Sequence, residues 1–414
     1  MRIATSTITQ IGTTGMNTQQ RQLVTLMEEI STNRTVNLAG DNPVSASQSV
    51  AVQTKVQNNT QYTANQNAAQ TSLGLEDSTL NSVTTQIKNI QQILQQANNG
   101  SLTDQDRAAY ASELQSARDQ LLSLANTTDA QGNYIFGGFQ TGTAPFTNTP
   151  GGAGVVYNGD QGVIGAQVSS QRRIPTNDPG SNVFLSATPG AATPIATAPS
   201  TNAGSGTIGV LSTTQSGAAT NNDSFTVAFQ TNASGVTTYT VTDNTLGTPA
   251  SQPTAYTAGS AIPLGTGQTI VINGTPSAGD TFNVAPPTAS QNNIFTTIDN
   301  AITALQTPGQ SAAGQTNMTN TLTSALQQVS NSYTTVLTTH ASVGSRETEL
   351  KTLSTLGTSI DTTYSTQLSN LVGLTTDAMA GVYSQLSTIQ TQLSATQKAY
   401  VSTQQLSLFT MIQT

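Results

Sequence analysis

Two long apolar repeats with a seven-residue period constrain this chain more than any other feature. The C-terminal repeat steps by four and three through Leu322, Leu326, Val329, Tyr333 and Val336, and continues through His340, Val343, Leu350, Leu353, Ile360 and Tyr364. The N-terminal half contains the second repeat, through Leu73, Leu80, Val83, Ile87, Ile90 and Leu94. A 3.5-residue period keeps one apolar stripe against a partner helix. The pattern predicts helices that pair with each other or with copies of themselves, as in a protein that assembles.

Charged residues make up only 8% of the 414 residues, against roughly 25% in an ordinary soluble domain. Ser, Thr, Asn and Gln occupy the places where Lys and Glu are usual, so these helices can pack on several sides without desolvating ions. An alternative interpretation is partial disorder, because low hydrophobicity weakens collapse. Helices that are disordered alone and ordered after assembly satisfy both interpretations.

Several functional classes are disfavoured by composition. The net charge of −8 argues against a nucleic-acid partner, and the absence of cysteine excludes disulfides and thiolate chemistry. We find no metal or cofactor motif and expect neither. The start has no apolar segment typical of a cleaved signal peptide, and no run approaches the roughly 18 apolar residues of a membrane span. We therefore expect no membrane insertion.

The N-terminal third predicts three helices. A stripe at Leu23, Met27 and Ile30 marks the first, and Asp41-Asn42-Pro43 breaks it because proline cannot continue a helix. A second helix should begin after Pro43 and run to about residue 98. Thr103, with Asp106 three residues later, resembles a capping box that opens the third helix.

The centre of the chain predicts strands. Asn158-Gly159, between aromatic and β-branched residues, indicates a hairpin. The segment from 181 to about 290 contains no Lys or Arg and alternates apolar with polar residues, which predicts a small antiparallel β-domain between the helical halves. Its expected strands pair Phe225, Val227 and Phe229 with Tyr239 and Val241, and pair Ile270 and Ile272 with Phe282 and Val284 around Gly274.

Helical spacing returns at Phe295, Ile298, Ile302 and Leu305, pauses at Pro308-Gly309, and resumes to the C-terminus. The fold class is therefore mainly α with inserted β: terminal coiled-coil helices, a rod-like helical bundle with a β-hairpin, and a small antiparallel β-domain inserted centrally.

Catalytic chemistry is not indicated. His340 lies on the apolar frame without a recognisable nucleophile or acid, so we interpret it as a polar seam residue. Glu347 and Glu349, near Arg346 and Lys351, suggest one solvated charged turn; an ion pair with a neighbouring element is the alternative. We predict that the protein is not an enzyme.

The chain resembles the bacterial flagellins and, within them, the hook-associated proteins of the hook–filament junction. The resemblance rests on Asp41, Asn42 and Pro43, on the closing helix, and on a central motif. That motif contains Tyr134, Ile135, Phe136, Gly137, Pro145 and Phe146, and we expect it to form a packed structural corner. Flagellins usually carry more acids before the last helix, where this chain keeps only Asp377.

The resemblance implies three domains: a terminal coiled coil of residues 1–40 and 370–414, a bundle of 41–180 and 290–369, and an outer β-domain of 181–289. It implies a ring of about eleven copies between hook-associated protein 1 and flagellin. It also implies an extracellular flagellar location reached through the flagellar type III route, without a cleaved signal peptide and with an export chaperone.

We therefore predict a structural adaptor that assembles through its terminal helices. A flagellin filament subunit is the first alternative, and a secreted surface adhesin is the second. The residues expected at the assembly interface are apolar and lie on both terminal helices: Leu23, Met27, Ile30, Leu386, Ile389, Leu393, Leu406 and Phe409.

Overall fold

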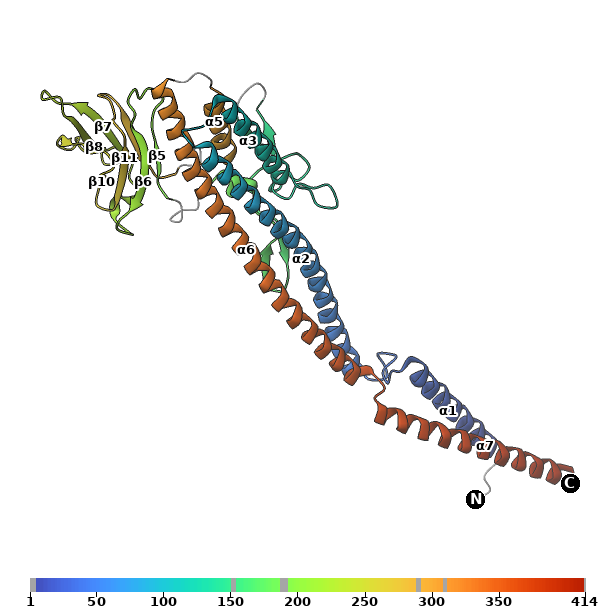
Figure 1. Ribbon diagram of the computed structural model, residues 1–414. Coiled ribbons are helices and arrows are strands. Elements are labelled where there is room, and N and C mark those ends of the chain that lie inside the picture. The colour runs from blue at the N-terminus through green and yellow to red at the C-terminus, as the bar shows by residue number, and fades with distance from the viewer. Residues whose placement is uncertain (1–4, 150–153, 187–192, 288–291, 308–310, 413–414) are drawn as a thin grey trace. The chain divides into compact units, whose positions relative to one another are not determined.

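The computed structural model describes residues 5–149, 154–186, 193–287, 292–307 and 311–412. It divides into two compact units: a terminal unit of Met1–Asn65 with Thr352–Thr414, and a central unit of Gln66–Lys351. Helices dominate both, and small antiparallel sheets occur in the central unit (Figure 1). The predicted fold class, mainly α with inserted β, is confirmed. The predicted three-domain division stays a prediction.

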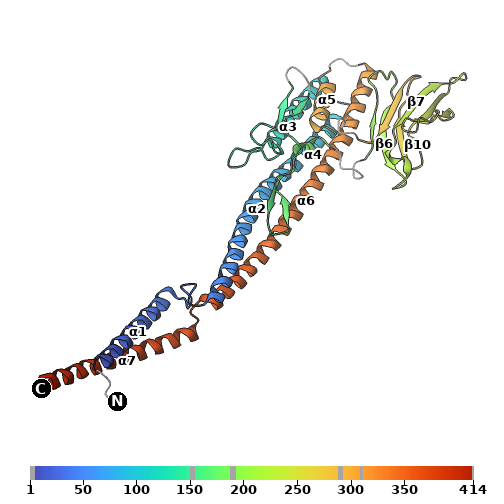
Figure 2. The same ribbon diagram turned by 180° about the vertical axis from the view of Figure 1, so that it is seen from behind.

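In the terminal unit, helix α1 (Thr5–Thr32) lies alongside helix α7 (Thr376–Ile412) in both views (Figures 1 and 2). The helices run antiparallel, because Tyr400 near the end of α7 lies over Gly12 near the start of α1. Backbone hydrogen bonds join them at the other end. Leu374 N donates to Asn33 O at 3.0 Å, and Thr35 N donates to Val372 O at 2.9 Å.

The Asp41-Asn42-Pro43 motif makes the turn into helix α2 (Pro43–Ala97). Asp41 Oδ2 accepts hydrogen bonds from the backbone of Asn37 and Leu38, which closes the loop. Asn42 Oδ1 accepts from Ser45 N at 3.0 Å, as an N-cap residue does. Pro43 is the first helical residue, where its missing N–H carries no penalty. The predicted helix start is confirmed.

The two apolar repeats meet along α2 and helix α6 (Ala312–Val372). Within the central unit both contribute a fully buried residue at every seventh position. Those of α2 are Leu73, Leu80, Ile87 and Leu94, and those of α6 are Leu322, Val329, Val336, Val343 and Leu350. His340 belongs to this seam, with Nε2 2.8 Å from Asp77 Oδ1 on α2.

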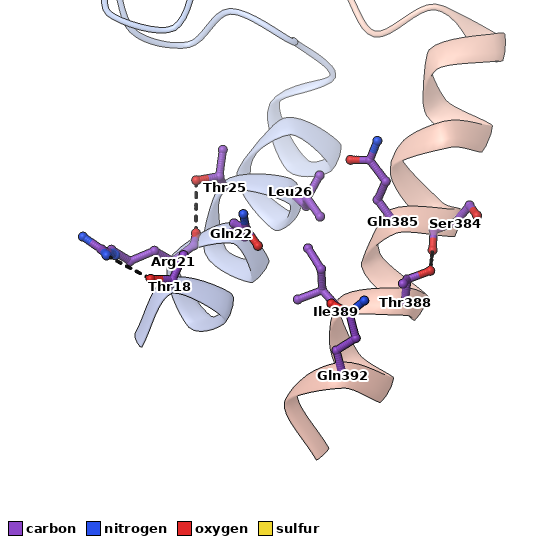
Figure 3. Close-up of a pocket in the computed structure, with 10 residues that line it drawn as sticks. All are labelled: Thr18, Arg21, Gln22, Thr25, Leu26, Ser384, Gln385, Thr388, Ile389 and Gln392. Carbon is purple, nitrogen blue, oxygen red and sulfur yellow. Dashed lines mark hydrogen bonds between the residues drawn. The ribbon is translucent and has the colours of Figure 1, made fainter. Parts of the chain in front are cut away.

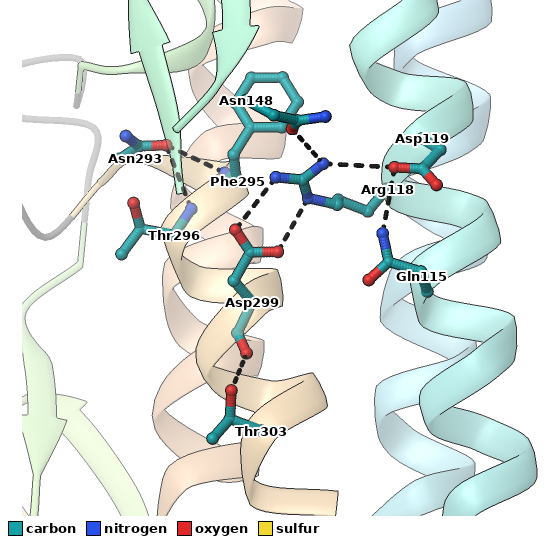
Figure 4. Close-up of polar contacts among 9 residues, drawn as sticks. All are labelled: Gln115, Arg118, Asp119, Asn148, Asn293, Phe295, Thr296, Asp299 and Thr303. Carbon is teal, nitrogen blue, oxygen red and sulfur yellow. Dashed lines mark hydrogen bonds and ion pairs between the residues drawn. The ribbon is translucent and has the colours of Figure 1, made fainter. Parts of the chain in front are cut away.

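Helix α3 (Asp104–Ala125) begins with the predicted capping box: Thr103 accepts from Asp106 N, and Asp106 accepts from Thr103 N. Helix α5 (Ile294–Gln306) packs beside α3. A buried ion pair joins these helices, with Arg118 Nε 2.8 Å and Nη2 3.2 Å from the two Asp299 oxygens (Figure 4). Arg118 Nη1 also donates to Asn148 Oδ1 at 2.7 Å, so the ion pair extends to strand β1 (Phe146–Asn148).

The inserted β-domain is a sandwich of two antiparallel sheets. The first, in order β5-β12-β7-β8-β9, contains Ile195–Thr197, Thr281–Ala285, Phe225–Thr231, Thr237–Asp243 and Thr254–Ala255. The second, in order β10-β11-β6, contains Ala261–Leu264, Gln268–Asn273 and Thr207–Thr213, and the 3₁₀-helix η1 (Ala219–Asn222) follows β6. One apolar core is shared by both sheets, as in other face-to-face sheet pairs. The predicted pairing of β7 with β8 is confirmed.

The second predicted pairing, of the strand with Ile270 and Ile272 with the strand of Phe282 and Val284, is wrong. β11 and β12 are strands, but β11 pairs with β10 and β6, while β12 pairs with β5 and β7. The segment between them crosses from one sheet to the other instead of forming a hairpin. Asp280 stabilises the segment between β11 and β12, because its carboxylate accepts hydrogen bonds from the backbone N–H groups of Ala203, Gly204 and Ser277. Ile272 and Phe282 therefore share a core without sharing a sheet.

A polar stripe on α6 attaches the sandwich. Asn320 accepts from Ile208 N at 2.8 Å and donates to Gly206 O at 3.0 Å, so its amide pairs with the edge of β6 as another strand would. Gln327 and Ser324 pair in the same way with Ala196 of β5. β5 and β6 each form one edge of their sheet. Helix α6 thus covers two strand edges that would otherwise be open to aggregation.

Two short hairpins pack on the helices. β1 pairs with β2 (Val155–Tyr157), and β3 (Gly165–Gln167) pairs with β4 (Arg173–Pro175). The prediction of a hairpin turn at Asn158-Gly159 is wrong, because β2 ends at Tyr157 and its partner lies before it in the chain. Asn158 N instead donates to Pro145 O at 2.7 Å, which fixes the exit of the β1–β2 hairpin.

The predicted solvated turn at 346–349 is also wrong. Arg346 is buried and pairs with the Asp178 carboxylate, while Glu349 accepts from Arg172 Nη2 at 2.7 Å. Asp178 and Arg172 belong to the β3–β4 hairpin and its exit, which precede helix α4 (Gly180–Phe184). The alternative interpretation, an ion pair with a neighbouring element, is confirmed for Glu349 and holds for Arg346 as well.

A candidate assembly surface on the terminal helices

The contact between α1 and α7 has a small core. Three side chains in this cluster are buried, Leu26 on α1 together with Leu374 and Val382. Five partly buried residues pack around them: Ile30, Ala378, Met379, Leu386 and Ile389. For helices of 28 and 37 residues this is little apolar burial. Apolar burial is the main source of stability. A partner that covered further apolar side chains of α1 and α7 would therefore stabilise this helix pair.

The structure brings part of the predicted interface together. Ile30, Leu386 and Ile389 join the cluster. Leu23 and Leu393 are half-buried, and Met27 is 50% exposed. The side chains of Leu406 and Phe409 lie outside the described residues. Whether these residues contact other subunits stays a prediction.

Sequence reasoning missed Leu26, the most buried residue of α1 in this cluster. The available signal was the alternative stripe of Leu23, Leu26 and Ile30, which steps by three and four residues. Met27, which we placed on the stripe, instead points toward solvent. A one-residue error in a helical stripe turns it by about 100°.

The terminal unit exposes many large apolar side chains besides Met27. Those on α1 and α7 are Ile11, Val24, Tyr383 and Val401, and the others are Leu38, Val44, Val50 and Leu356. Single exposed apolar residues are ordinary, whereas many on slender helices mark an interaction surface.

A groove of about 610 Å³ runs between α1 and α7 (Figure 3). Its apolar floor is Leu26 and Ile389, and polar side chains form its rim: Thr18, Arg21, Gln22, Thr25, Ser384, Gln385, Thr388 and Gln392. Arg21 points away from α7 in this view. An apolar floor with a polar rim suits a docking side chain better than a reacting substrate.

Ionic contacts are distributed unevenly. Every ion pair among the described residues lies in the central unit. In the described part of the terminal unit, exposed charges such as Arg21, Glu28 and Lys398 have no ionic partner on their own chain. These charges are available to another molecule.

The central motif forms an aromatic corner in the central unit. Phe136 and Phe146 are buried and contact Phe184 edge-to-face, with ring centroids 5.4 and 5.3 Å away. Gly138, at φ +69°, lets Asp160 approach closely enough to accept from Phe139 N at 2.7 Å. Tyr134 and Ile135 are half-buried, whereas Gly137 and Pro145 are buried. Polar groups here bond to backbone, which makes the corner a packing element.

The described residues contain no group of three or more His, Cys, Asp or Glu suited to a metal ion. Across those same ranges, no helix is long and apolar enough to cross a membrane. Paired terminal helices with incomplete burial, joined to a helical bundle with an inserted sandwich, define a flagellin-type structural protein.

Comparison with known proteins supports this class. Residues 3–141 match the bacterial flagellin N-terminal helical region. Flagellar hook-associated protein 3 of Escherichia coli strain K12 is 29% identical over 410 residues, covering 99% of both chains. The crystal structure of Xanthomonas campestris FlgL is 31% identical, with a TM-score of 0.66 over 75% of this chain and 97% of that one. The structure of the flagellar junction protein FlgL from Legionella pneumophila is 27% identical, with a TM-score of 0.67 over 79% of this chain and 100% of that one.

The chain belongs to the flagellar hook-associated protein 3 family. It is a component of the bacterial flagellum, outside the cell, and its relatives are structural proteins.

Proposed function

We propose that this chain is the adaptor that joins the hook, through hook-associated protein 1, to the flagellin filament. About eleven copies would form a ring, each packing its terminal helices against the next. The observation that carries the proposal is the terminal unit itself, whose few buried residues lie beside a groove and many exposed apolar side chains. The printed name of the Legionella relative, a junction protein, supports the same role.

The low charge of the terminal helices fits this role. An exposed apolar side chain of about Leu size stabilises by roughly 1.5–3 kcal/mol when it becomes fully buried. Several such residues per subunit supply enough free energy to order the helices on assembly. Passage through the flagellar type III route, with a chaperone covering the terminal helices, would keep this surface from aggregating before assembly. The cysteine-free sequence suits a chain that travels unfolded.

The test replaces Leu386 and Leu393 by Asp in cells that lack the wild-type chain. Two carboxylates on the apolar side of α7 should prevent ring formation, so the protein is secreted as a monomer and the cells lack filaments. A matched control places the same charges at the exposed positions Ser387 and Ser394, and we expect it to keep most swimming. Normal swimming by the Leu386→Asp, Leu393→Asp variant would refute the proposal.

A flagellin filament subunit is the second candidate, because the matched N-terminal helical region is common to flagellins. The two functions differ in location: a filament subunit occurs along the whole filament, and an adaptor occurs only where the filament begins.

A further inference from the structure

The dipeptide Asn-Gly occurs three times in the chain, at 99–100, 158–159 and 273–274. In this dipeptide the glycine nitrogen can attack the side-chain amide of the asparagine, because glycine has no Cβ to block the approach. The attack needs a backbone that brings the glycine N and the asparagine Cγ together. The fold around each dipeptide therefore decides how fast it reacts.

The dipeptide at 158–159 is restrained at both residues. Asn158 N donates to Pro145 O at 2.7 Å, and Asn158 Nδ2 donates to Thr147 Oγ1 at 2.8 Å. Gly159 is tightly packed, because a Cβ built on it would collide with the hydroxyl of Tyr157. These contacts hold the dipeptide in one conformation and tie up the amide that would have to leave.

The dipeptide at 273–274 is restrained by the sandwich. Asn273 is the last residue of β11 and pairs with Thr207 of β6. The ladder keeps its backbone extended, which turns Gly274 N away from the Asn273 side chain. Gly274 lies close against Ser205, and its carbonyl oxygen accepts from Tyr256 Oη at 3.0 Å.

The dipeptide at 99–100 is the unrestrained one. It lies in the connector 98–103 between α2 and α3, and both Asn99 and Gly100 are exposed. Among the described residues, no atom lies within 4 Å of a Cβ built on Gly100. Over the same residues, Gly100 N donates no backbone hydrogen bond. The attacking nitrogen is therefore open to solvent and to the neighbouring side chain.

The next residue activates the Asn99 amide. Ser101 N donates to Asn99 Oδ1 at 3.1 Å, and the ring that this hydrogen bond closes contains both Gly100 N and Asn99 Cγ. An attack on Cγ places negative charge on Oδ1, which the Ser101 N–H is positioned to stabilise. The local geometry thus brings the two reacting atoms together and polarises the bond that is attacked.

We propose that Asn99 is a site of spontaneous deamidation, with water as the only co-reactant. Gly100 N loses its proton to hydroxide and forms a bond to Asn99 Cγ; the Cγ–Nδ2 bond breaks, and Nδ2 takes up a proton and leaves as ammonia. Water then opens the cyclic imide at either of its carbonyl carbons, which leaves aspartate or isoaspartate at position 99. No atom is oxidised or reduced. The inference does not depend on the proposed function.

Either product changes the connector between α2 and α3. A carboxylate at position 99 lies just past the C-terminal end of α2, where the helix dipole disfavours negative charge. Isoaspartate also lengthens the main chain by one carbon atom, shortly before the capping box that begins α3 at Thr103. The modified chain is therefore a second form of the protein with an altered joint between these helices.

Peptide mapping of the purified full-length protein by mass spectrometry tests the proposal. The protein is kept at 37 °C at pH 7 and at pH 8. Trypsin, which cuts after Lys88 and Arg107, releases the peptide with Asn99, and a chymotrypsin digest covers Asn158 and Asn273. We expect deamidation at Asn99 to be at least about tenfold faster than at the other two sites, to be faster at pH 8, and to yield isoaspartate. Equal rates at the three sites, or aspartate without isoaspartate, would overturn the proposal.

Two controls separate the effect of the fold from that of the sequence. In a denaturing concentration of urea the restraints are lost, so the three dipeptides should react at rates within about threefold of one another. An equally large preference for Asn99 in urea would show that the fold does not set the order, and would overturn the argument. The variant G100A has room for its Cβ. It should keep the circular dichroism of the wild type and slow deamidation at Asn99 by at least about tenfold. An unchanged rate in G100A would show that Gly100 N is not the nucleophile, with the same consequence.

Discussion

Replacing Glu76 by Gln should remove a pH dependence of stability that the wild-type protein carries. Glu76 is 1% exposed on α2, and its Oε1 accepts from Asp178 N at 3.0 Å. Arg346 pairs with the Asp178 carboxylate. The buried Glu76 carboxyl therefore lies close to a second acid, Asp178, whose own partner is the Arg346 guanidinium. Burial raises the pKa of Glu76 to about 9, the nearby Asp178 carboxylate acts in the same direction, and Arg346 opposes them.

The direction and size of this pH dependence follow from the number of protons that the folded and unfolded states bind. In the unfolded chain Glu76 loses its proton near its ordinary pKa of 4.5, whereas in the folded chain it keeps the proton to about pH 9. Between these values the folded state binds one more proton at Glu76, so the contribution of Glu76 to stability is greatest below pH 4.5 and falls as pH rises. Each pH unit costs about 1.4 kcal/mol, so the loss between pH 6 and pH 9 reaches about 4 kcal/mol.

Urea unfolding followed by circular dichroism at pH 6, 7.5 and 9 measures this loss. Hydrogen exchange of residues 165–180 shows whether the β3–β4 hairpin loosens first. E76Q keeps the acceptor oxygen but cannot ionise, so its stability should change far less over this range. E349Q is the matched control: Arg172 lowers the pKa of Glu349, so Glu349 is already ionised throughout and the variant should keep the wild-type slope. Equal slopes for wild type and E76Q would refute the reasoning.

Three further predictions concern stability. R118L leaves Asp299 buried without its partner and should cost about 3–5 kcal/mol, measured by urea unfolding; a loss below about 1 kcal/mol would show that water replaces the guanidinium. N320A leaves two backbone groups of the β6 edge unpaired and should cost about 1–3 kcal/mol, with faster hydrogen exchange at Ile208 as its signature. T103A removes one half of a capping box and should lower stability by about 0.5–2 kcal/mol; the same loss in T128A, outside any helix, would contradict a capping origin.

The helical half of the fold was predictable because its determinants are local. The seven-residue period, the cap at Thr103 and the proline at position 43 each act within a few residues, and all were found where the sequence indicated them. The alternation of Phe225, Val227 and Phe229 similarly predicted a strand with one buried face.

The errors arose where partners distant in sequence decide the outcome. Asn158-Gly159 has hairpin composition, but β2, the strand before it, pairs with β1, which lies earlier in the chain. Arg346 resembles a surface residue until the β3–β4 hairpin covers it. Asn320 and Gln327 lie on a polar stripe with heptad spacing, which we did not interpret as a docking face for strand edges. Leu26 was missed because two apolar stripes on α1, one through Leu26 and one through Met27, both have helical spacing.

The central claim is that this chain joins hook to filament, and its location on the cell tests that claim most directly. Immunogold electron microscopy of intact cells, with antibodies against residues 181–289, measures this location. The account predicts one narrow band of label where the hook ends and the filament begins. Label along the whole filament would make the chain a filament subunit, and label elsewhere on the cell surface would contradict the account.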